Sequence, residues 1–427
     1  MEWVLVVALM GVNLVLWTLV GGLRFTSESL ADPADTDTPF KLRPSDVAVL
    51  IPAHNEEPVI AATIQSALRL VPPGNVHVVA DGCDDATAEI ARANGADVLE
   101  LEPGRGKAGG IEAGIEHFQI PGRFPVVLIL DADTELDEHY LERGLPLLDK
   151  PGVVALAGYA RAGWRPQELS PVGRFIAAYR TRLYAVMQWL KYGQTWRWTN
   201  VTAIVPGFAS MYWTSTLRRM DLNPPGLVIE DFNMTFEIHH RRLGKIAFHP
   251  GVFATTQDPD NLRDYYRQVL RWHLGFWQTL RRHGFWFSGF SAALALFLIE
   301  VVTASVGLVL LAAALALLTP LVLVDYLTLG WDIDLGGVVD VYTVLVMVLL
   351  LALAIDYLLT CLTALAFRRP ALLLYGLGFL TLRFVDATAA LWTIPQAWRA
   401  RSDGRWTSPK RRRSARSPQP TARGQPS

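Results

Sequence analysis

Polar side chains able to bind phosphates or a metal ion follow three short apolar runs in the first third of the chain. They are Pro52, His54, Asn55 and Glu56 after residues 47–51, Asp81 after residues 76–80, and Asp131 and Asp133 after residues 126–130. Hard carboxylate oxygens suit Mg²⁺ or Mn²⁺, with substrate phosphates completing the ligand set. Since residues i and i+2 of an extended segment point the same way, we expect Asp131 and Asp133 to face one metal site. A solvated acidic turn is the alternative interpretation of this pair.

A glycine-rich stretch, residues 104–110, leads into a predicted helix and contains Lys107. Backbone amides, a helix N-terminus and this ammonium group could together hold a phosphate. A flexible turn would have the same composition. No GxGxxG follows the first apolar run, and the chain has no GxxxxGK[ST]. The sequence therefore argues against a Rossmann dehydrogenase and a P-loop NTPase.

A sheet is needed to bring these polar groups together. Residues 47–51, 76–80, 97–101 and 126–130 are mostly continuous apolar or β-branched runs, typical of strands buried on both faces of a parallel sheet. Helical patterns over residues 58–70, 86–94 and 107–118 alternate with them. This alternation predicts an α/β domain with an open parallel sheet, in which ligands bind beyond the carboxyl ends of the strands.

Seven short motifs follow one another along the chain. They are Ile51-Pro-Ala-His-Asn-Glu56, Asp81-Gly-Cys-Asp-Asp85, Gly106-Lys-Ala108, Asp131-Ala-Asp133, Pro206-Gly-Phe208, Glu230-Asp231 and Gln268-Val-Leu-Arg-Trp272. In this order they resemble the membrane-bound family-2 glycosyltransferases, which include cellulose, hyaluronan, chitin-oligosaccharide and poly-N-acetylglucosamine synthases. The resemblance covers residues 47–272. It implies a Rossmann-like GT-A-type domain, a UDP-sugar donor, and Mg²⁺ or Mn²⁺ as cofactor.

The resemblance also implies a role for each matching position. Asp231 would be the general base with Glu230 beside it, and Asp133 would bind the metal, with Asp131 close to both the metal and the nucleotide. The other expected substrate-binding residues are Pro52, Glu56, Asp81, Lys107, Gly207, Gln268, Arg271 and Trp272. The last three would hold the diphosphate and the acceptor sugar. Trp272 has an alternative role as a membrane-interface anchor.

These roles agree with the chemistry of sugar transfer. An acceptor hydroxyl has a high pKa, so a carboxylate must take its proton as the new bond forms. A divalent ion, with Arg271 or Lys107, can neutralise the charge of the leaving nucleoside diphosphate. One base and no second carboxylate nucleophile imply a single displacement with inversion. Ala80 and Cys83 depart from the family's usual residues, which weakens the expectation of detailed uracil contacts but not that of phosphate chemistry; Ile229 stands where the family usually has Thr.

Composition points to the membrane, since 51% of residues are hydrophobic and 19% charged, against roughly 25% charged in soluble domains. Apolar runs over residues 3–23, 290–324 and 338–367 are long enough to span a bilayer. A cleaved signal peptide is the alternative for the first run. A weaker run, 372–392, could lie in the interface, dip into the bilayer or cross it. Lys and Arg near the run ends predict that the middle of the chain is cytoplasmic.

We therefore expect five units: an N-terminal transmembrane helix at 1–24, a cytoplasmic glycosyltransferase domain at 45–260, an interface helix at 261–288, a C-terminal membrane region of two or three helices at 289–397, and a disordered basic tail at 398–427. Residues 174–192 suit an amphipathic interface helix or an ordinary core helix. The tail, with its consecutive Lys and Arg at 410–413, suits the anionic inner leaflet, and no nucleic-acid partner is expected.

The predicted function is inverting, metal-dependent transfer of a sugar from a UDP-sugar to a growing β-linked polysaccharide at the plasma membrane. The partners would be this donor, the acceptor and membrane lipids, with a homo-oligomer or an accessory export subunit as a further expectation. The alternative is a glycosyltransferase that adds one or a few sugars to a membrane lipid. A distant alternative is an inactive scaffold or transport subunit, which would be expected to lose Asp133 or Asp231.

Overall fold

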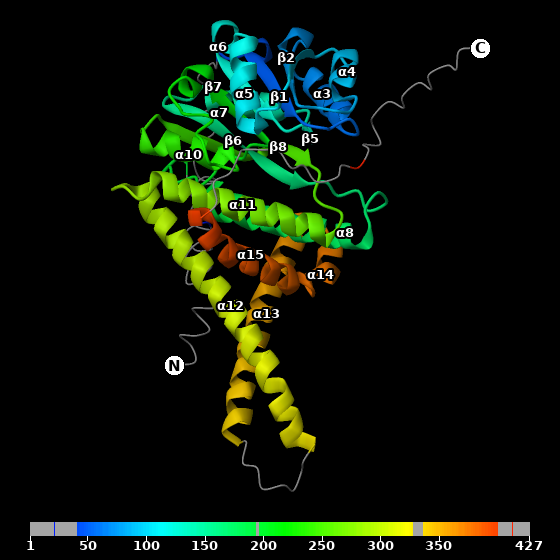
Figure 1. The fold of residues 1–427 in the computed structure, drawn as a ribbon, viewed down its shortest axis with the longest axis vertical. Coiled ribbons are helices and arrows are strands. Elements are labelled where there is room, and N and C mark those ends of the chain that lie inside the picture. The colour runs from blue at the N-terminus through cyan, green and yellow to red at the C-terminus, as the bar shows by residue number, and fades with distance from the viewer. Residues whose placement is uncertain (1–20, 22–40, 194–195, 328–335, 400–411, 413–427) are drawn as a thin grey trace, which may run out of the picture.

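The computed structural model describes residues 21, 41–193, 196–327, 336–399 and 412 (Figure 1). The predicted N-terminal span, apart from Gly21, and most of the predicted basic tail lie outside these residues.

The first half of the sheet is parallel, as the sequence predicts. The strands are β1 (Val47–Ala53), β2 (Val76–Asp81), β3 (Asp97–Leu101) and β4 (Val126–Leu130), in the order β3-β2-β1-β4 with parallel pairing. β1, β2 and β4 are buried along their whole length, because helices cover the sheet and leave no face to water. The carboxyl ends of these strands meet at one edge, where Asp81 and Asp131 follow.

The second half of the sheet is mixed, which the prediction of an open parallel sheet did not include. β7 (Ala209–Trp213) runs antiparallel to β4 and to β6 (Val153–Ala162), and β6 pairs in parallel with β8 (Lys245–Thr256). The short β5 (Thr134–Leu136) pairs antiparallel with β8 at the end of the sheet. Since β4 turns at Asp131 straight into β5, the chain leaves the parallel half and reaches the far edge.

Helices pack on the sheet between these strands. α3 (Ile60–Leu68), α4 (Thr87–Ala93) and α5 (Gly106–His117) match the three predicted helical patterns. The other elements of this domain are η2 (Pro44–Asp46), η3 (Pro73–Asn75), α6 (Ile120–Arg123), α7 (Tyr140–Leu148), α9 (Thr214–Leu217) and α10 (Glu230–His240). α5 packs against β1 and β2, which places its N-terminus beside the carboxyl ends of those strands.

A layer of helices lies beneath the domain in Figure 1. It contains α8 (Pro171–Tyr184), continued by the π-helix η4 (Ala185–Tyr192), together with α11 (Leu262–His283), α14 (Ala371–Gly376) and α15 (Phe379–Arg399). α11 packs along α15, and α14 packs on α8. The amphipathic helix predicted at 174–192 therefore exists as α8 and η4, and it contacts both the sheet and the C-terminal helices.

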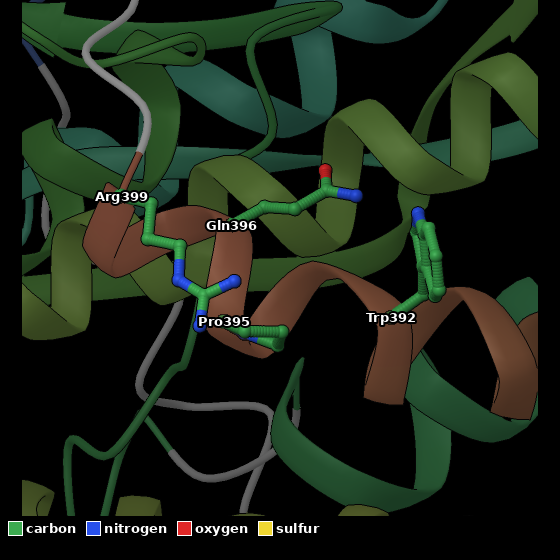
Figure 2. Close-up of a pocket in the computed structure, with 4 residues that line it drawn as sticks. All are labelled: Trp392, Pro395, Gln396 and Arg399. Carbon is green, nitrogen blue, oxygen red and sulfur yellow. The ribbon is translucent and has the colours of Figure 1, made fainter.

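Two long apolar helices extend away from this layer (Figure 1). They are α12 (Gly289–Leu327) and α13 (Gly336–Ala366), with mean hydropathies of 2.6 and 2.7 over their most apolar windows. In the described part of the chain these two have the length and composition of membrane spans. α15, which contains most of the weaker run, instead lies along α11. Its residues Trp392, Pro395, Gln396 and Arg399 line a pocket on one face of this helix (Figure 2).

Arg412, the described residue of the basic tail beyond α15, contacts the segment that follows β8. Its backbone N–H donates to Gln257 Oε1 at 3.3 Å, and its carbonyl accepts from Gln257 Nε2 at 3.0 Å. Its guanidinium lies 2.7 Å from Asp260 Oδ1. This residue therefore pairs with the α/β domain, whereas the sequence suggested the membrane surface as the partner of the tail.

Gly158 allows β6 to approach β7 closely. A Cβ at this position would lie 2.0 Å from the Ala209 carbonyl oxygen, which belongs to a backbone that cannot easily move. We predict that Gly158→Ala lowers the free energy of unfolding by about 1–3 kcal/mol, as overpacking of a core does. Thermal unfolding in nanodiscs measures the change. Gly74→Ala is the control, because nothing lies within 4 Å of its added Cβ; equal stability of the two variants would contradict the prediction.

Candidate active site

Lys107 joins three segments of the chain at the centre of the candidate site. Its Nζ lies 2.7 Å from Asp131 Oδ1 and 2.7 Å from Glu230 Oε1. Burial disfavours the charged ammonium, but the two carboxylates outweigh that cost and raise the pKa of Lys107. The end of β4, the start of α5 and the start of α10 are therefore held together by one buried cation.

Asp81 fixes the position of Lys107 by capping α5. Its Oδ1 accepts the Arg105 backbone N–H at 2.6 Å, and its Oδ2 accepts that of Gly106 at 2.7 Å. Both oxygens of this 2%-exposed carboxylate are thus bonded to the first amides of the helix, where a negative charge is favourable. The structure gives Asp81 a positioning role, and its predicted contact with the nucleotide stays a prediction.

Asp131 and Asp133 lie in a turn, so the prediction of an extended pair was wrong. The Thr134 N–H donates to the Asp131 carbonyl at 3.1 Å, as in a β-turn, because the chain must leave β4 and enter β5. The Thr63 hydroxyl of α3 holds the turn by donating to the Ala132 carbonyl at 2.7 Å. The two carboxylates remain in electrostatic contact, and burial together with Asp133 raises the pKa of Asp131 against the opposing effect of Lys107.

Asp231 is the carboxylate with the clearest capacity to accept a proton. Its Oδ2 accepts the Gly207 N–H at 3.2 Å and its Oδ1 accepts the Phe232 N–H at 2.7 Å. Burial, and next the neighbouring charge of Glu230, raise its pKa to about 7, although Lys107 and the two amides oppose the rise. Since Glu230 is bound to Lys107, the two adjacent acids have different electrostatic surroundings.

Gly207 is required by the close approach of its loop to these charges. An added Cβ would lie 2.9 Å from both Glu230 Oε1 and Lys107 Nζ. The Lys107 ammonium also lies 3.4 Å from the Gly207 carbonyl oxygen. The loop before β7 therefore closes one side of the charged cluster.

Pro52 and Glu56 belong to the neighbouring strand end. Pro52 is buried within β1, opposite Val79 of β2. Glu56 is 1% exposed, and its backbone N–H donates to the Thr87 hydroxyl at 2.8 Å. The loop after β1 is also bonded to the loop after β2, since the Asp84 N–H donates to Asn55 Oδ1 at 2.9 Å. Both predicted residues are thus parts of a rigid wall, and their contacts with substrate stay predictions.

Gln268, Arg271 and Trp272 lie on α11. Gln268 and Trp272 both contact Arg180 of α8, at 3.0 Å from its Nη2 to Gln268 Oε1 and 4.3 Å from its guanidinium to the Trp272 ring centre. Arg271 is partly exposed and forms no ion pair with the described carboxylates. A guanidinium without a carboxylate partner is suited to an anionic ligand.

α11 also contacts the segment that precedes Asp231. Gln278 Oε1 accepts the Val228 N–H at 3.0 Å, and Gly275 lies against Ile229. Trp272 and Gln278 are separated by about 9 Å along the helix axis at 1.5 Å per residue. One helix therefore carries the Gln-x-x-Arg-Trp motif and supports the two acids.

Sequence reasoning missed Arg180, Gln278 and Thr63. The interface-helix prediction included Arg180 only as one of several basic residues. An arginine among apolar positions of a helix is a weak signal of a buried role, because long basic side chains usually extend to water. Nothing in the sequence separated Gln278 or Thr63 from ordinary helix residues.

The carboxylates fit a divalent metal only if the donor supplies most of its ligands. Among the described residues, no three His, Cys, Asp or Glu side chains converge on one point. Asp133 is 8% exposed at the edge of the sheet, while Asp131 is paired with Lys107. Mg²⁺ and Mn²⁺ commonly bind through one or two carboxylates and substrate phosphates, so this donor set is compatible with either ion.

The fold and the motifs place the chain in a known class of enzymes. The chain belongs to the glycosyltransferase-like family 2, whose sequence profile matches residues 44–275. The matched region contains the GT-A-like mixed α/β sheet described above.

Two curated proteins are similar to this chain in sequence. A probable glycosyltransferase of Bacillus subtilis, YdaM, is 27% identical over 253 residues, which are 54% of each chain. A dolichyl-phosphate hexose transferase of Haloferax volcanii is 36% identical over 104 residues, 24% of this chain and 43% of that protein. The chain thus spans about half the length of the curated relatives it matches.

The fold is also similar to that of a solved structure. The mannosyltransferase PcManGT of Pyrobaculum calidifontis, in complex with GDP-Man and Mn²⁺, matches 92% of this chain and 99% of its own, with a TM-score of 0.51 and 17% sequence identity. Similarity at this level shows a shared fold.

Removal of the Lys107 ammonium should leave the buried Glu230 and the partly exposed Asp131 without a cationic partner. We predict that Lys107→Met costs about 1–3 kcal/mol of stability at neutral pH, less than the loss of one partner from a fully buried ion pair because solvent reaches Asp131. The pKa of Asp131 is already raised by burial, and the loss of Lys107 removes an influence that lowers it, so stability should recover as the pH falls. Thermal unfolding between pH 5 and 8 measures this. The surface variant Lys245→Met is the control. If Lys107→Met were as stable as the wild type at every pH, the central role of the ion pairs would be contradicted.

Proposed function

We propose that the chain transfers a hexose or N-acetylhexosamine from a UDP-sugar to an acceptor at the cytoplasmic membrane face, with inversion at the anomeric carbon. The observation that carries this proposal is the arrangement of Asp231, Glu230, Lys107 and Asp131 at the carboxyl ends of the strands. In open α/β sheets that edge is where ligands bind.

Asp231 is the proposed general base. Its pKa of about 7 means that both the charged and the neutral form are populated near neutral pH, which matches a base that must accept and release a proton there. Glu230 is occupied by Lys107 at 2.7 Å, so it is unsuited to attack the sugar as a nucleophile. One free carboxylate supports direct displacement by the acceptor hydroxyl, in which the sugar leaves the donor and the diphosphate departs on the opposite side.

Lys107, Arg271 and Asp133 are proposed to act on the leaving group. Lys107 and Arg271 would offset the negative charge of the nucleoside diphosphate, and Asp133 would hold the metal with Asp131 beside it. When bound, Mg²⁺ or Mn²⁺ supplies Lewis-acid stabilisation of the phosphate oxygens. Mn²⁺ accompanies GDP-Man in the complex of the Pyrobaculum mannosyltransferase, which supports a metal here. Experiment must decide whether the donor nucleotide of this chain contains uracil or guanine.

The proposed acceptor is a growing β-linked glycan. This rests on the Gln268–Trp272 motif, which lies on the same helix that supports the acids and offers an aromatic face for a sugar ring. A lipid-linked acceptor is the second candidate, favoured by the relative named dolichyl-phosphate hexose transferase. The two candidate spans among the described residues and the predicted N-terminal span are few for a polymer channel, so we propose that an oligomer or an export subunit accompanies synthesis of a glycan product.

We predict that Asp231→Asn abolishes transfer while donor binding in the presence of Mn²⁺ is retained. The amide keeps the shape of the side chain but cannot accept the proton. Transfer and donor binding are measured on the same purified protein in nanodiscs. Turnover near the wild-type rate would remove Asp231 as the base.

The pKa of Asp231 also predicts a pH profile. The base must be ionised, so kcat/KM should be constant above about pH 7 and fall about tenfold for each pH unit below it. A profile that stays flat down to pH 5 would show that a group other than Asp231 accepts the proton.

A panel of radiolabelled nucleotide sugars tests the function itself. Purified protein in lipid nanodiscs is given UDP- and GDP-sugars with Mn²⁺, and the products are sized on a gel and extracted with organic solvent. A ladder or smear of high molecular weight from a UDP-sugar is the expected result. A single extractable product would establish the lipid acceptor, and absence of transfer from every donor would contradict the proposal.

A further inference from the structure

Arg180 is a buried cation at the junction of α8 and α11. Its side chain is 1% exposed, although arginine is almost never fully buried without partners. It comes from α8 and not from any of the seven motifs. The positive charge must therefore be compensated by the groups around it, and those groups define what it does.

The groups around Arg180 are the acceptor-side residues of α11. Gln268 and Trp272 are four residues apart, so they lie on one face of the helix. The Arg180 Nη2 donates to Gln268 Oε1 at 3.0 Å, and the guanidinium lies 4.3 Å from the centre of the Trp272 ring. Tyr265, on the same side of α11, has its ring centre 4.8 Å from the guanidinium. One planar cation thus contacts both motif side chains at once.

A longer-range charge contact lies at the other end of the guanidinium. Asp258 is 7% exposed and follows β8, and its Oδ1 lies 3.9 Å from Arg180 Nε, which donates no hydrogen bond within the described part of the chain. The same oxygen accepts the Tyr184 hydroxyl at 3.3 Å. Asp258 therefore offsets the charge of Arg180 from the side of the sheet, while the hydrogen bond of Arg180 goes to α11.

We propose that Arg180 is a positioning residue for acceptor recognition, which orients the Gln268 amide and the Trp272 ring. This rests on the proposed role of α11 in binding the acceptor. The guanidinium covers one face of the indole, so a sugar ring can stack on the other face. Without Arg180 the ring and the amide regain side-chain freedom, and the acceptor must fix them when it binds, which weakens binding.

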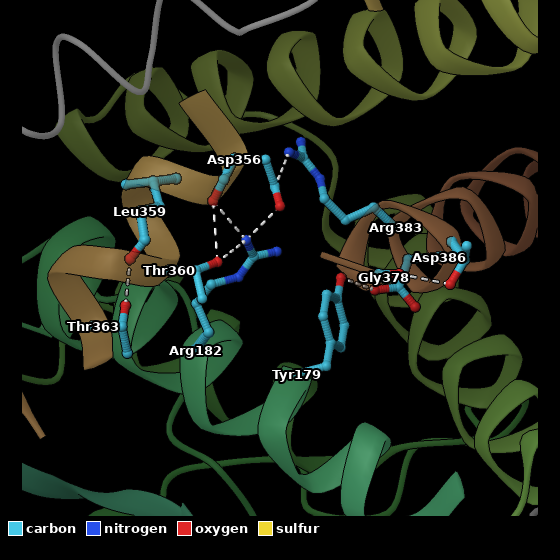
Figure 3. A network of polar contacts seen from close by, with 10 residues as sticks. Tyr179, Arg182, Asp356, Leu359, Thr360, Thr363, Gly378, Arg383 and Asp386 are labelled. Atoms are coloured by element: carbon cyan, nitrogen blue, oxygen red, sulfur yellow. Dashed lines mark hydrogen bonds and ion pairs between the residues drawn. The ribbon is translucent and has the colours of Figure 1, made fainter. Parts of the chain in front are cut away.

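Arg182 provides a matched control on the same helix. It is also buried, but it points to the membrane helices and not to α11 (Figure 3). Its Nη1 lies 2.5 Å from Asp356 Oδ2 and donates to the Thr360 hydroxyl at 3.0 Å, and Arg383 of α15 contacts the same carboxylate at 2.7 Å. Loss of Arg182 therefore tests what removal of a buried arginine from α8 does when the motif residues are left in place.

The test compares Arg180→Ala, Arg180→Lys and Arg182→Ala in nanodiscs. The donor is the one that supports transfer, and the acceptor probes are β-linked glucose and N-acetylglucosamine pentasaccharides and a short-chain polyprenyl phosphate. We expect Arg180→Ala to raise the acceptor KM by about tenfold or more, since a charged hydrogen bond and a cation–π contact are lost together. The donor KM and the slow hydrolysis of donor without acceptor should not change. Lysine keeps a charge near the ring but cannot make the same hydrogen bond, so its acceptor KM should be intermediate.

A double-mutant cycle separates positioning from a general structural role. If Arg180 acts through Trp272, the effects of Arg180→Ala and Trp272→Ala on the acceptor KM should not add up. The double variant should exceed Trp272→Ala only by the part of the effect that passes through Gln268. Additive effects of the two substitutions, or equal changes in acceptor KM for Arg180→Ala and Arg182→Ala, would overturn the proposal. If Arg180→Ala does not fold, Arg180→Lys against the wild type decides in the same way.

Failure of the proposed function gives a different result. If the wild type neither transfers nor hydrolyses any donor, no acceptor KM can be measured for any variant. The same cycle measured by thermal unfolding then tests the contact between Arg180 and Trp272. Non-additive melting temperatures support the contact on which the positioning role depends, and additive ones overturn it.

Discussion

The candidate site depends on one largely buried ion-pair cluster, in which Lys107 lies between Asp131 and Glu230 and offsets part of their negative charge. Two carboxylates from distant parts of the chain can lie this close only if a cation compensates them, because unpaired charges are costly to bury. Asp81 makes the arrangement possible by capping α5 and so fixing the helix that carries Lys107. With Glu230 occupied, the adjacent Asp231 is the acid whose carboxylate is held by backbone amides and whose pKa is raised towards neutrality.

α11 connects this cluster to the other helices of the layer beneath the domain, which are α8, η4, α14 and α15. At one end it contacts Val228 through Gln278, close to the two acids, and in the middle it carries Gln268 and Trp272 against Arg180. Trp277 donates to the Ala390 carbonyl of α15 at 3.1 Å, so the same helix is fixed from below. Sites held on rigid elements keep their geometry better than sites on loops, and here one helix would position both the base and the acceptor face.

The sequence predicted the strands of the parallel half and the motif positions because these depend on local patterns. Continuous apolar runs identify β1, β2 and β4, and short motifs identify Lys107, Asp131 and Asp231. The mixed half of the sheet could not be predicted, since the antiparallel position of β7 beside β4 depends on long-range pairing. The prediction that Asp131 and Asp133 lie in an extended segment was wrong for a related reason. Residues i and i+2 point the same way only within a strand, and β4 ends at Leu130. Arg180 was missed because its contact with Gln268 joins residues 88 positions apart, which no local pattern reveals.

The central claim is that Asp231 acts alone as a base while Lys107 withholds Glu230 from nucleophilic attack. The stereochemistry of the product tests this most directly. With an α-linked nucleotide sugar as donor, proton NMR of the isolated product, before any anomeric equilibration, should show a β-linkage. An α-linked product would mean net retention, which requires a covalent intermediate or a front-face reaction and would contradict the account.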